Sequence, residues 1–134
     1  MAGYSGRPLV DKLGIKPGTR IVILNAPRGY RATLGSLPPG VVVASAARGT
    51  FPFIQFFTRS RTLLESKVPL LLRALEPDGA LWISWPKKAS GVATDLTEDV
   101  IRVIGLAHGL VDVKVAAVDD VWSGLKFVRR VTDR

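Results

Sequence analysis

The 134-residue sequence contains no cysteine and a single histidine, His108. The absence of cysteine excludes disulfides, thiolate metal sites and a cysteine nucleophile, and one histidine cannot form a histidine-based metal cluster. His108 falls in the last turn of a predicted helix, with no carboxylate or serine adjacent to it in sequence. A general base needs partners within hydrogen-bonding reach. We therefore expect no metal site and identify no catalytic residue.

Long apolar runs are also missing. No run approaches the roughly 20 residues that cross a bilayer, and the segment Met1 to Arg7 lacks the basic-then-apolar layout of a signal peptide. We therefore expect a cytoplasmic protein with no membrane partner. Hydrophobic residues make up 47% of the chain and charged residues 22%, which is enough apolar material for one core. We expect a single domain over residues 1–134.

Acidic residues are scarce relative to basic ones. Lys and Arg number 19 against 11 Asp and Glu, which gives a formal net charge of +8. Such a charge favours polyanions, because neutralising phosphates releases counterions. The basic residues are nevertheless spread from Arg7 to Arg134 with no long basic block, as on an ordinary solvated surface. Nucleic-acid binding is therefore an alternative interpretation.

Apolar β-branched runs alternate with segments of helical periodicity. The run R-I-V-I-L at 20–24 is typical of a strand covered on both faces of a parallel sheet. The pattern predicts strands at 20–24, 41–44, 53–58, 80–85, 111–117 and 125–131, and helices at 9–13, at 30–34, from Ser60 to Leu75 and from Asp95 to about Gly109. This order predicts a Rossmann-like α/β fold: a mainly parallel twisted sheet with a C-terminal antiparallel strand pair and helices on both faces.

Local signals add detail to this expectation. Pro69 predicts a kink or a restart in the helix that Ser60 begins, and 77–79 reads as a turn. Asp95 and Glu98 have the spacing of a capping box, and 122–124 reads as the turn of the closing strand pair. Trp82 is expected in the core.

Some stretches resemble a known scaffold. K-L-G-I-K-P-G-T-R-I-V-I-L at 12–24, L-L-L-R-A-L-E-P-D-G-A-L-W-I-S at 70–84 and the closing strand pair resemble the framework of S-adenosylmethionine-dependent methyltransferases of the Rossmann-like class, shortened in the middle. More specifically, the opening G-Y-S-G-R-P-L, W-P-K-K-A-S-G-V-A-T-D-L-T-E-D-V at 85–100 and the ending at 111–128 resemble a family of small bacterial proteins known as domain of unknown function 3052. No activity comes with that family.

The methyltransferase resemblance implies a glycine-rich loop after the first strand and an acidic residue at the end of the second. This chain instead has N-A-P-R-G at 25–29, in which Pro27 has no N–H to donate, and A-S-A-A at 44–47. We therefore expect no cofactor, with S-adenosylmethionine as the alternative.

Ligands of open parallel sheets bind outside the carboxyl ends of the strands. The loops at that edge hold polar and aromatic side chains suited to an anion and a ring. The candidate ligand-binding residues are Asn25, Arg28, Lys87, Lys88, Ser90, Trp122 and Ser123.

The main interpretation is a non-catalytic module that binds an anionic small molecule or a protein partner at this edge, through the loop 87–94. One alternative is a minimal or divergent methyltransferase, with Asn25 and the remaining glycine in place of the usual loop. The other is a nucleic-acid-binding protein, whose affinity should fall steeply with salt.

Overall fold

In a computed structural model the described residues are 7–134. Most of the segment from Met1 to Arg7, and with it the first residues of the family resemblance, therefore lies outside the described part. Among residues 7–134 no helix is long and apolar enough to cross a membrane.

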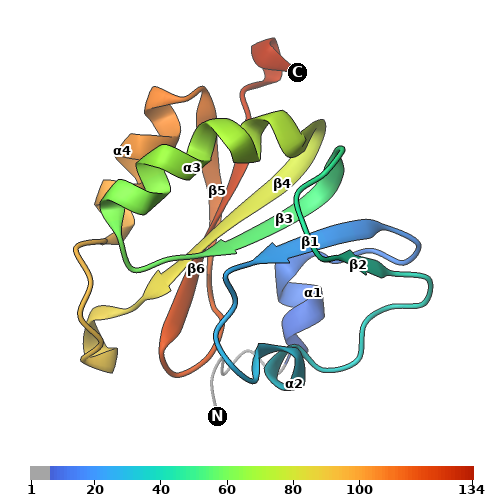
Figure 1. The fold of residues 1–134 in the computed structure, drawn as a ribbon, viewed down its shortest axis with the longest axis horizontal. Helices are drawn as coiled ribbons and strands as arrows, with labels where there is room; N and C mark the ends of the chain where they lie inside the picture. Colours follow the sequence, from blue (N-terminus) through green and yellow to red (C-terminus); the bar gives the residue numbers. More distant parts are fainter. Residues whose placement is uncertain (1–6) are drawn as a thin grey trace.

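A six-stranded sheet with the order β2-β1-β3-β4-β6-β5 forms the centre of the molecule (Figure 1). The first four strands in this order are parallel, and β6 is antiparallel to both of its neighbours. The predicted fold class, with its C-terminal antiparallel pair, is therefore confirmed. The strands are β1 (Arg20–Leu24), β2 (Val42–Ala44), β3 (Phe51–Phe57), β4 (Leu75–Pro86), β5 (Leu110–Ala117) and β6 (Trp122–Arg129).

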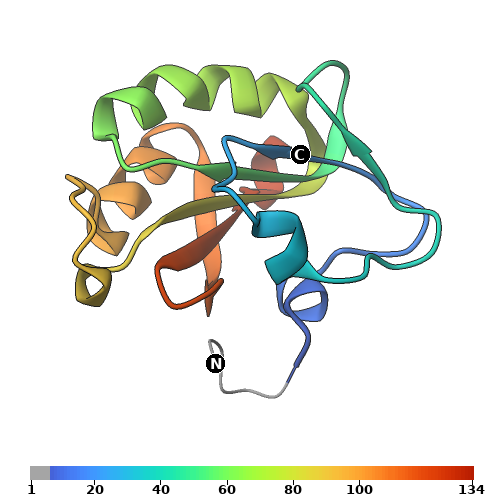
Figure 2. The ribbon, with the colours of Figure 1, turned by 60° about the horizontal axis from the view of Figure 1, so that its bottom comes forward.

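Helices cover both faces of the sheet (Figures 1 and 2). On one face α1 (Leu9–Leu13) and α2 (Tyr30–Leu34) pack on an apolar cluster that includes Trp82. On the other face α3 (Arg61–Ala74) and α4 (Glu98–Ala107) pack on a second cluster, which includes Trp85. Trp82 is fully buried, as expected for a core residue. Short 3-10 turns lie at η1 (Lys88–Ser90) and η2 (Val131–Asp133).

The connection from β2 to β3 is unusually short for a parallel crossover, which commonly needs a dozen or more residues and a helix. Residues 45–50 alone pass across β1. Ala44 and Ala47 pack against the core cluster under α3, so this segment takes the place of a covering helix. The segment leaves a hollow uncovered beside α3, at the end of β1.

Some local details differ from expectation. The helix does not restart at Pro69 but continues as one helix over α3, because the carbonyl that loses its N–H partner belongs to Glu65 on the same exposed side, where water can reach it. Residues 77–79 lie within β4, where the pairing with β3 is irregular.

The two remaining differences concern element ends. Thr97, and not Asp95, caps α4, because its side chain accepts the N–H of Val100 (Oγ1 to N, 3.2 Å). The strand β6 already begins at Trp122, so the turn before it is formed by 118–121. Apolar periodicity marks the middle of an element better than its ends.

Candidate functional site

The carboxyl ends of β1 and β3 form the topological switch point of the sheet. The chain leaves β1 to reach β2 on one side and then crosses back to β3 on the other side. Connections that diverge in this way leave a crevice between the two strand ends, where α/β proteins bind ligands. Two adjoining hollows lie here, and both are lined by Asn25 and Leu63.

The first, which we call the apolar hollow, has a volume of about 420 Å³. It lies between the end of β1, the crossover 45–50 and the side of α3. Its polar groups are few, and it is lined by Leu24, Asn25, Ser45, Ala46, Ala47, Phe56, Leu63, Lys67, Leu70 and Leu71. An apolar slot with a few polar groups is the usual character of a small-molecule site.

The second, which we call the polar hollow, has a volume of about 440 Å³. It is lined by Asn25, Thr58, Arg59, Ser60, Leu63 and Ala93. One wall belongs to the loop after β4, which is tied to the start of α3. The hydroxyl of Thr94 donates to the carbonyl of Arg59 (2.7 Å), and Asp95 accepts the backbone N–H of Arg61 (2.8 Å). Arg59 is exposed here and offers a positive charge to a ligand.

Asn25 sits between the two hollows in a backbone conformation that normally belongs to glycine. Its φ of 61° is the only positive value for a non-glycine residue in the described chain. Asparagine tolerates this region better than most residues. Its side-chain amide also donates to the carbonyl of Phe57 (Nδ2 to O, 2.8 Å), which ties the end of β1 to the end of β3.

The loop after Asn25 is anchored to the sheet by a series of buried side-chain hydrogen bonds. The Tyr30 hydroxyl donates to Gln55 (Oη to Oε1, 2.7 Å), and the Gln55 amide donates to Ser84 (Nε2 to Oγ, 3.2 Å). Burial raises the pKa of Tyr30 above its ordinary value, so this phenol stays neutral. Tyr30 therefore acts as an anchor of α2 on the sheet, with Phe57 edge-on to its ring.

Of the residues that the sequence indicates, only Asn25 lines either hollow. Arg28 is exposed in the loop after β1, and Lys87 and Lys88 begin the loop after β4. All three lie at the expected edge, because they follow the carboxyl ends of β1 and β4. The N–H of Lys87 also bonds to the carbonyl of Val121 at the turn before β6.

Ser90, Trp122 and Ser123 have structural contacts instead. The hydroxyl of Ser90 donates to the carbonyl of Lys87 (2.7 Å) and closes a tight turn. The ring of Trp122 packs edge-on against Phe57, with 5.2 Å between centroids. Ser123 pairs with its neighbours on both sides of β6.

Sequence reasoning missed the residues that form most of the apolar hollow. Residues 44–47 were noted only for their lack of an acidic residue, and no role was assigned to Leu63, Lys67 and Leu70 of the predicted helix. The signal that was available is the short distance in sequence between β2 and β3, which leaves no room for a helix over β1.

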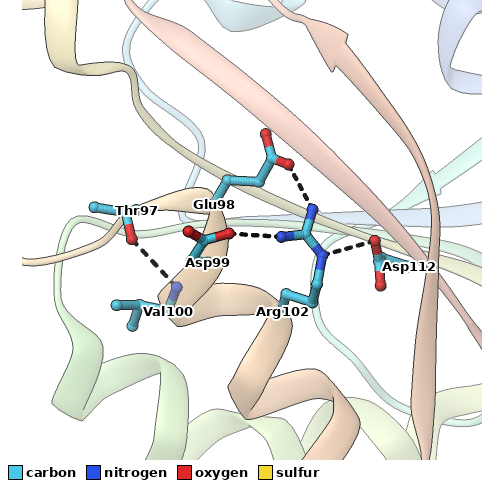
Figure 3. Close-up of polar contacts among 6 residues, drawn as sticks. All are labelled: Thr97, Glu98, Asp99, Val100, Arg102 and Asp112. Atoms are coloured by element: carbon cyan, nitrogen blue, oxygen red, sulfur yellow. Dashed lines mark hydrogen bonds and ion pairs between the residues drawn. The ribbon is translucent and has the colours of Figure 1, made fainter.

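A separate polar cluster joins α4 to β5 (Figure 3). The Arg102 guanidinium donates to Asp112 (Nε to Oδ2, 2.9 Å), to Asp99 (Nη1 to Oδ1, 2.8 Å) and to Glu98. The hydrogen bond from Arg102 holds the pKa of Asp112 below its ordinary value. The bond from Arg102 to Asp112 holds α4 on the edge strand β5. None of these residues lines either hollow.

Solved structures of methyltransferases share this fold. A SAM-dependent methyltransferase from Aquifex aeolicus has a TM-score of 0.63 at 15% identity, over 89% of this chain and 86% of that chain. The N-methyltransferase NodS from Bradyrhizobium japonicum has 0.60 at 14% identity, over 90% and 92%. Magnesium protoporphyrin IX methyltransferase from Synechocystis, solved with bound SAM, has 0.56 at 12% identity, over 91% and 74%.

No model of a protein family matches the chain, and no curated protein sequence does. The resemblance to family 3052 therefore stays a prediction. At these identities the structural likeness establishes the fold.

The likeness corrects two expectations. The interpretation as a non-catalytic binding module was wrong, because many solved structures that share the fold are methyltransferases and favour the methyltransferase alternative. The expectation of no cofactor was wrong on the same ground, since a protein of this fold is solved with SAM bound. The chain has the methyltransferase-like Rossmann fold.

Proposed function

We propose that this protein is an S-adenosylmethionine-dependent methyltransferase whose cofactor site is formed by the apolar and polar hollows. The observation that carries the proposal is the pair of adjoining hollows at the switch point, with Asn25 in a glycine-like conformation between them. The fold that the chain shares with methyltransferases supports the same assignment.

The apolar hollow fits an adenine ring. Leu24, Leu63 and Leu70 offer aliphatic surface for its faces, and burying a flat aromatic ring against such surface is favourable. Two nearby groups can form hydrogen bonds with the hydroxyls and ring nitrogens of adenosine. They are the Ser45 hydroxyl and the side-chain oxygen of Asn25.

The polar hollow fits the amino-acid end of the cofactor. Arg59 lines it and is exposed, and a guanidinium binds a carboxylate through paired charge-assisted hydrogen bonds. The Ser60 hydroxyl already accepts the N–H of Leu63 (3.1 Å) as the cap of α3, so we assign Ser60 to shaping the hollow.

The chain departs from the family pattern at the ribose. The resemblance implies an acidic residue at the end of the second strand, whereas β2 is followed by Ser45 and Ala46. The loop after β1 departs less than its sequence indicates, because Asn25 and Gly29 have φ values of 61° and 81°. Two positions of the loop thus keep the backbone geometry that a glycine-rich loop provides.

The cofactor would supply an electrophilic methyl group carried on a sulfonium. Among the side chains that line the hollows none is a carboxylate or histidine. The protein's own contribution is therefore to bind and orient the reactants and to exclude water. We expect an acceptor that is nucleophilic without help from a protein base.

Titration calorimetry with S-adenosylmethionine and S-adenosylhomocysteine tests the proposal. Ala46 is exposed on the rim of the apolar hollow, so Ala46→Trp should fill that hollow without disturbing the core. The matched control is Ala107→Trp, an exposed alanine at the end of α4. We expect the unaltered protein and the control to bind the cofactor. With Ala46→Trp the affinity should fall at least about tenfold, because the indole would occupy the place of the adenine ring. Absence of binding, or equal binding by all three proteins, would contradict the proposal.

We further propose a nucleic acid as the methyl acceptor. Arg28, Lys87 and Lys88 lie at the carboxyl edge, and none of them forms an ion pair within residues 7–134. If about three phosphates are neutralised, affinity for a single strand should fall about 20-fold between 50 and 200 mM salt. Filter binding of a short RNA measures this, with Arg28→Ala and Lys88→Ala each reducing the salt slope. Salt-insensitive binding would exclude it.

A further inference from the structure

A third hollow lies on the other side of the crossover 45–50. It has a volume of about 570 Å³ and is lined by Arg20, Val43, Ala44, Ser45, Ala46 and Arg48. Two arginines and one serine thus line the space, and no acidic residue does. We call it the arginine hollow.

Arg20 is held in a fixed position at this hollow. Its guanidinium carbon lies 4.3 Å from the centre of the Phe51 ring, and one N–H group donates to the carbonyl of Arg48 (Nη2 to O, 3.1 Å). A Cβ added to Gly49 would lie 3.4 Å from the Nη1 atom, so the crossover backbone packs directly against the group. The remaining N–H donors of Arg20 keep a defined direction without a loss of side-chain entropy on binding.

Within residues 7–134 the two arginines have no anionic partner. Neither Arg20 nor Arg48 forms an ion pair with any residue in the described chain. Surface arginines commonly pair with nearby carboxylates, and a pair without one attracts an anion. A phosphate suits this arrangement, because it accepts several charge-assisted hydrogen bonds at once.

The arginine hollow adjoins the apolar hollow, since Ser45 and Ala46 line both. In nucleotide-binding α/β folds an acidic residue near the end of the second strand binds the ribose hydroxyls, whereas an arginine there accommodates a phosphate on the ribose. This chain has Ser45 and Arg48 in that region and no acidic residue between 41 and 50.

We propose that the arginine hollow binds a phosphate group, and that the site takes an adenosine compound phosphorylated on its ribose. The proposal shares with the proposed function only the assignment of the apolar hollow to adenosine. It adds a ligand class that the methyltransferase assignment does not require.

Titration calorimetry tests the proposal with adenosine, adenosine 2′-monophosphate and adenosine 3′-monophosphate as probes. At least one phosphorylated probe should bind about tenfold or more tightly than adenosine, the size expected for hydrogen bonds to a charged group. Arg48→Ala removes an exposed side chain, and Arg20→Lys keeps the charge but loses the planar fork. Each should abolish the preference, whereas Arg31→Ala, an exposed arginine of α2 on the other face, should keep it.

The outcomes separate this proposal from the proposed function. Equal affinity for all three probes, or a phosphate preference that survives in both arginine variants, overturns the arginine hollow as a phosphate site. A phosphate preference in a protein that does not bind S-adenosylhomocysteine supports the arginine hollow and contradicts the methyltransferase assignment. Circular dichroism of each variant checks its fold, and Arg48→Ala decides the question if Arg20→Lys unfolds.

Discussion

Replacing Tyr30 by phenylalanine tests the buried side-chain hydrogen bonds that hold the loop beside the hollows. The ring would remain in the core, where it packs against Phe57 with 4.7 Å between centroids, and only the hydroxyl would be lost. That hydroxyl donates to Gln55, whose side chain is fully buried. The Gln55 oxygen would then lack a donor in a place that water does not reach. An orphaned buried polar group costs about 1–3 kcal/mol.

A cost of about 2 kcal/mol corresponds to a fall in melting temperature of about 8 °C for a domain of this size. Thermal denaturation followed by circular dichroism at pH 7 measures it. In the double variant with Gln55→Met the orphaned oxygen is absent, so the combined cost should be smaller than the sum of the single costs. Additive costs, or a loss below about 0.5 kcal/mol for Tyr30→Phe, would show that the hydrogen bond from Tyr30 to Gln55 does not stabilise the fold as proposed.

The same residue predicts a dependence on alkaline pH. Burial raises the pKa of Tyr30 in the folded protein above the ordinary value of about 10 for tyrosine. The unfolded chain therefore loses this proton first as the pH rises. The stability from the neutral phenol is complete below about pH 10 and declines above it. The decline should be shallower in Tyr30→Phe, and equal declines in both proteins would refute the assignment.

Further predictions concern the remaining structural contacts. Asn25→Ala should cost more stability than Asn25→Gly, by about 1 kcal/mol in chemical denaturation, because only alanine is strained at a positive φ. Gly105→Ala should destabilise by about 1–3 kcal/mol despite better helix propensity, since the added Cβ would lie 2.3 Å from Phe127 Cε1. Because Arg102 lowers the pKa of Asp112, the ion pair stabilises above about pH 4 and is lost below it, so Asp112→Asn should flatten the fall in stability between pH 5 and 2.

The fold was largely predictable because its central strands are apolar on both faces. From Ile21 to Leu24 the run has no exposed residue, which is typical of a parallel strand covered on both faces. The course of α3 through Pro69 was not predictable from propensity, because it depends on which side of the helix faces water. The cap of α4 was missed because Asp95 is used by α3, through the N–H of Arg61.

The candidate site was predictable only in its position at the carboxyl edge. Asn25 could be named because it directly follows a buried strand. The conformation of Asn25, and the hollow beside Ser45 and Lys67, follow from the path of a short crossover, which the residue types along it do not reveal. The sequence made the loop at 25–29 look unsuited to a cofactor, whereas its backbone retains two glycine-like positions.

Backbone amide NMR during a titration with S-adenosylhomocysteine reports both whether the ligand binds and where it binds. We predict saturable shifts at the amides of Asn25, Ser45, Ala46 and Leu63, which line the two hollows, and none at Val103 on the exposed side of α4. No shifts at all, or shifts confined to residues outside the hollows, would contradict the assignment of this edge as a methyltransferase site.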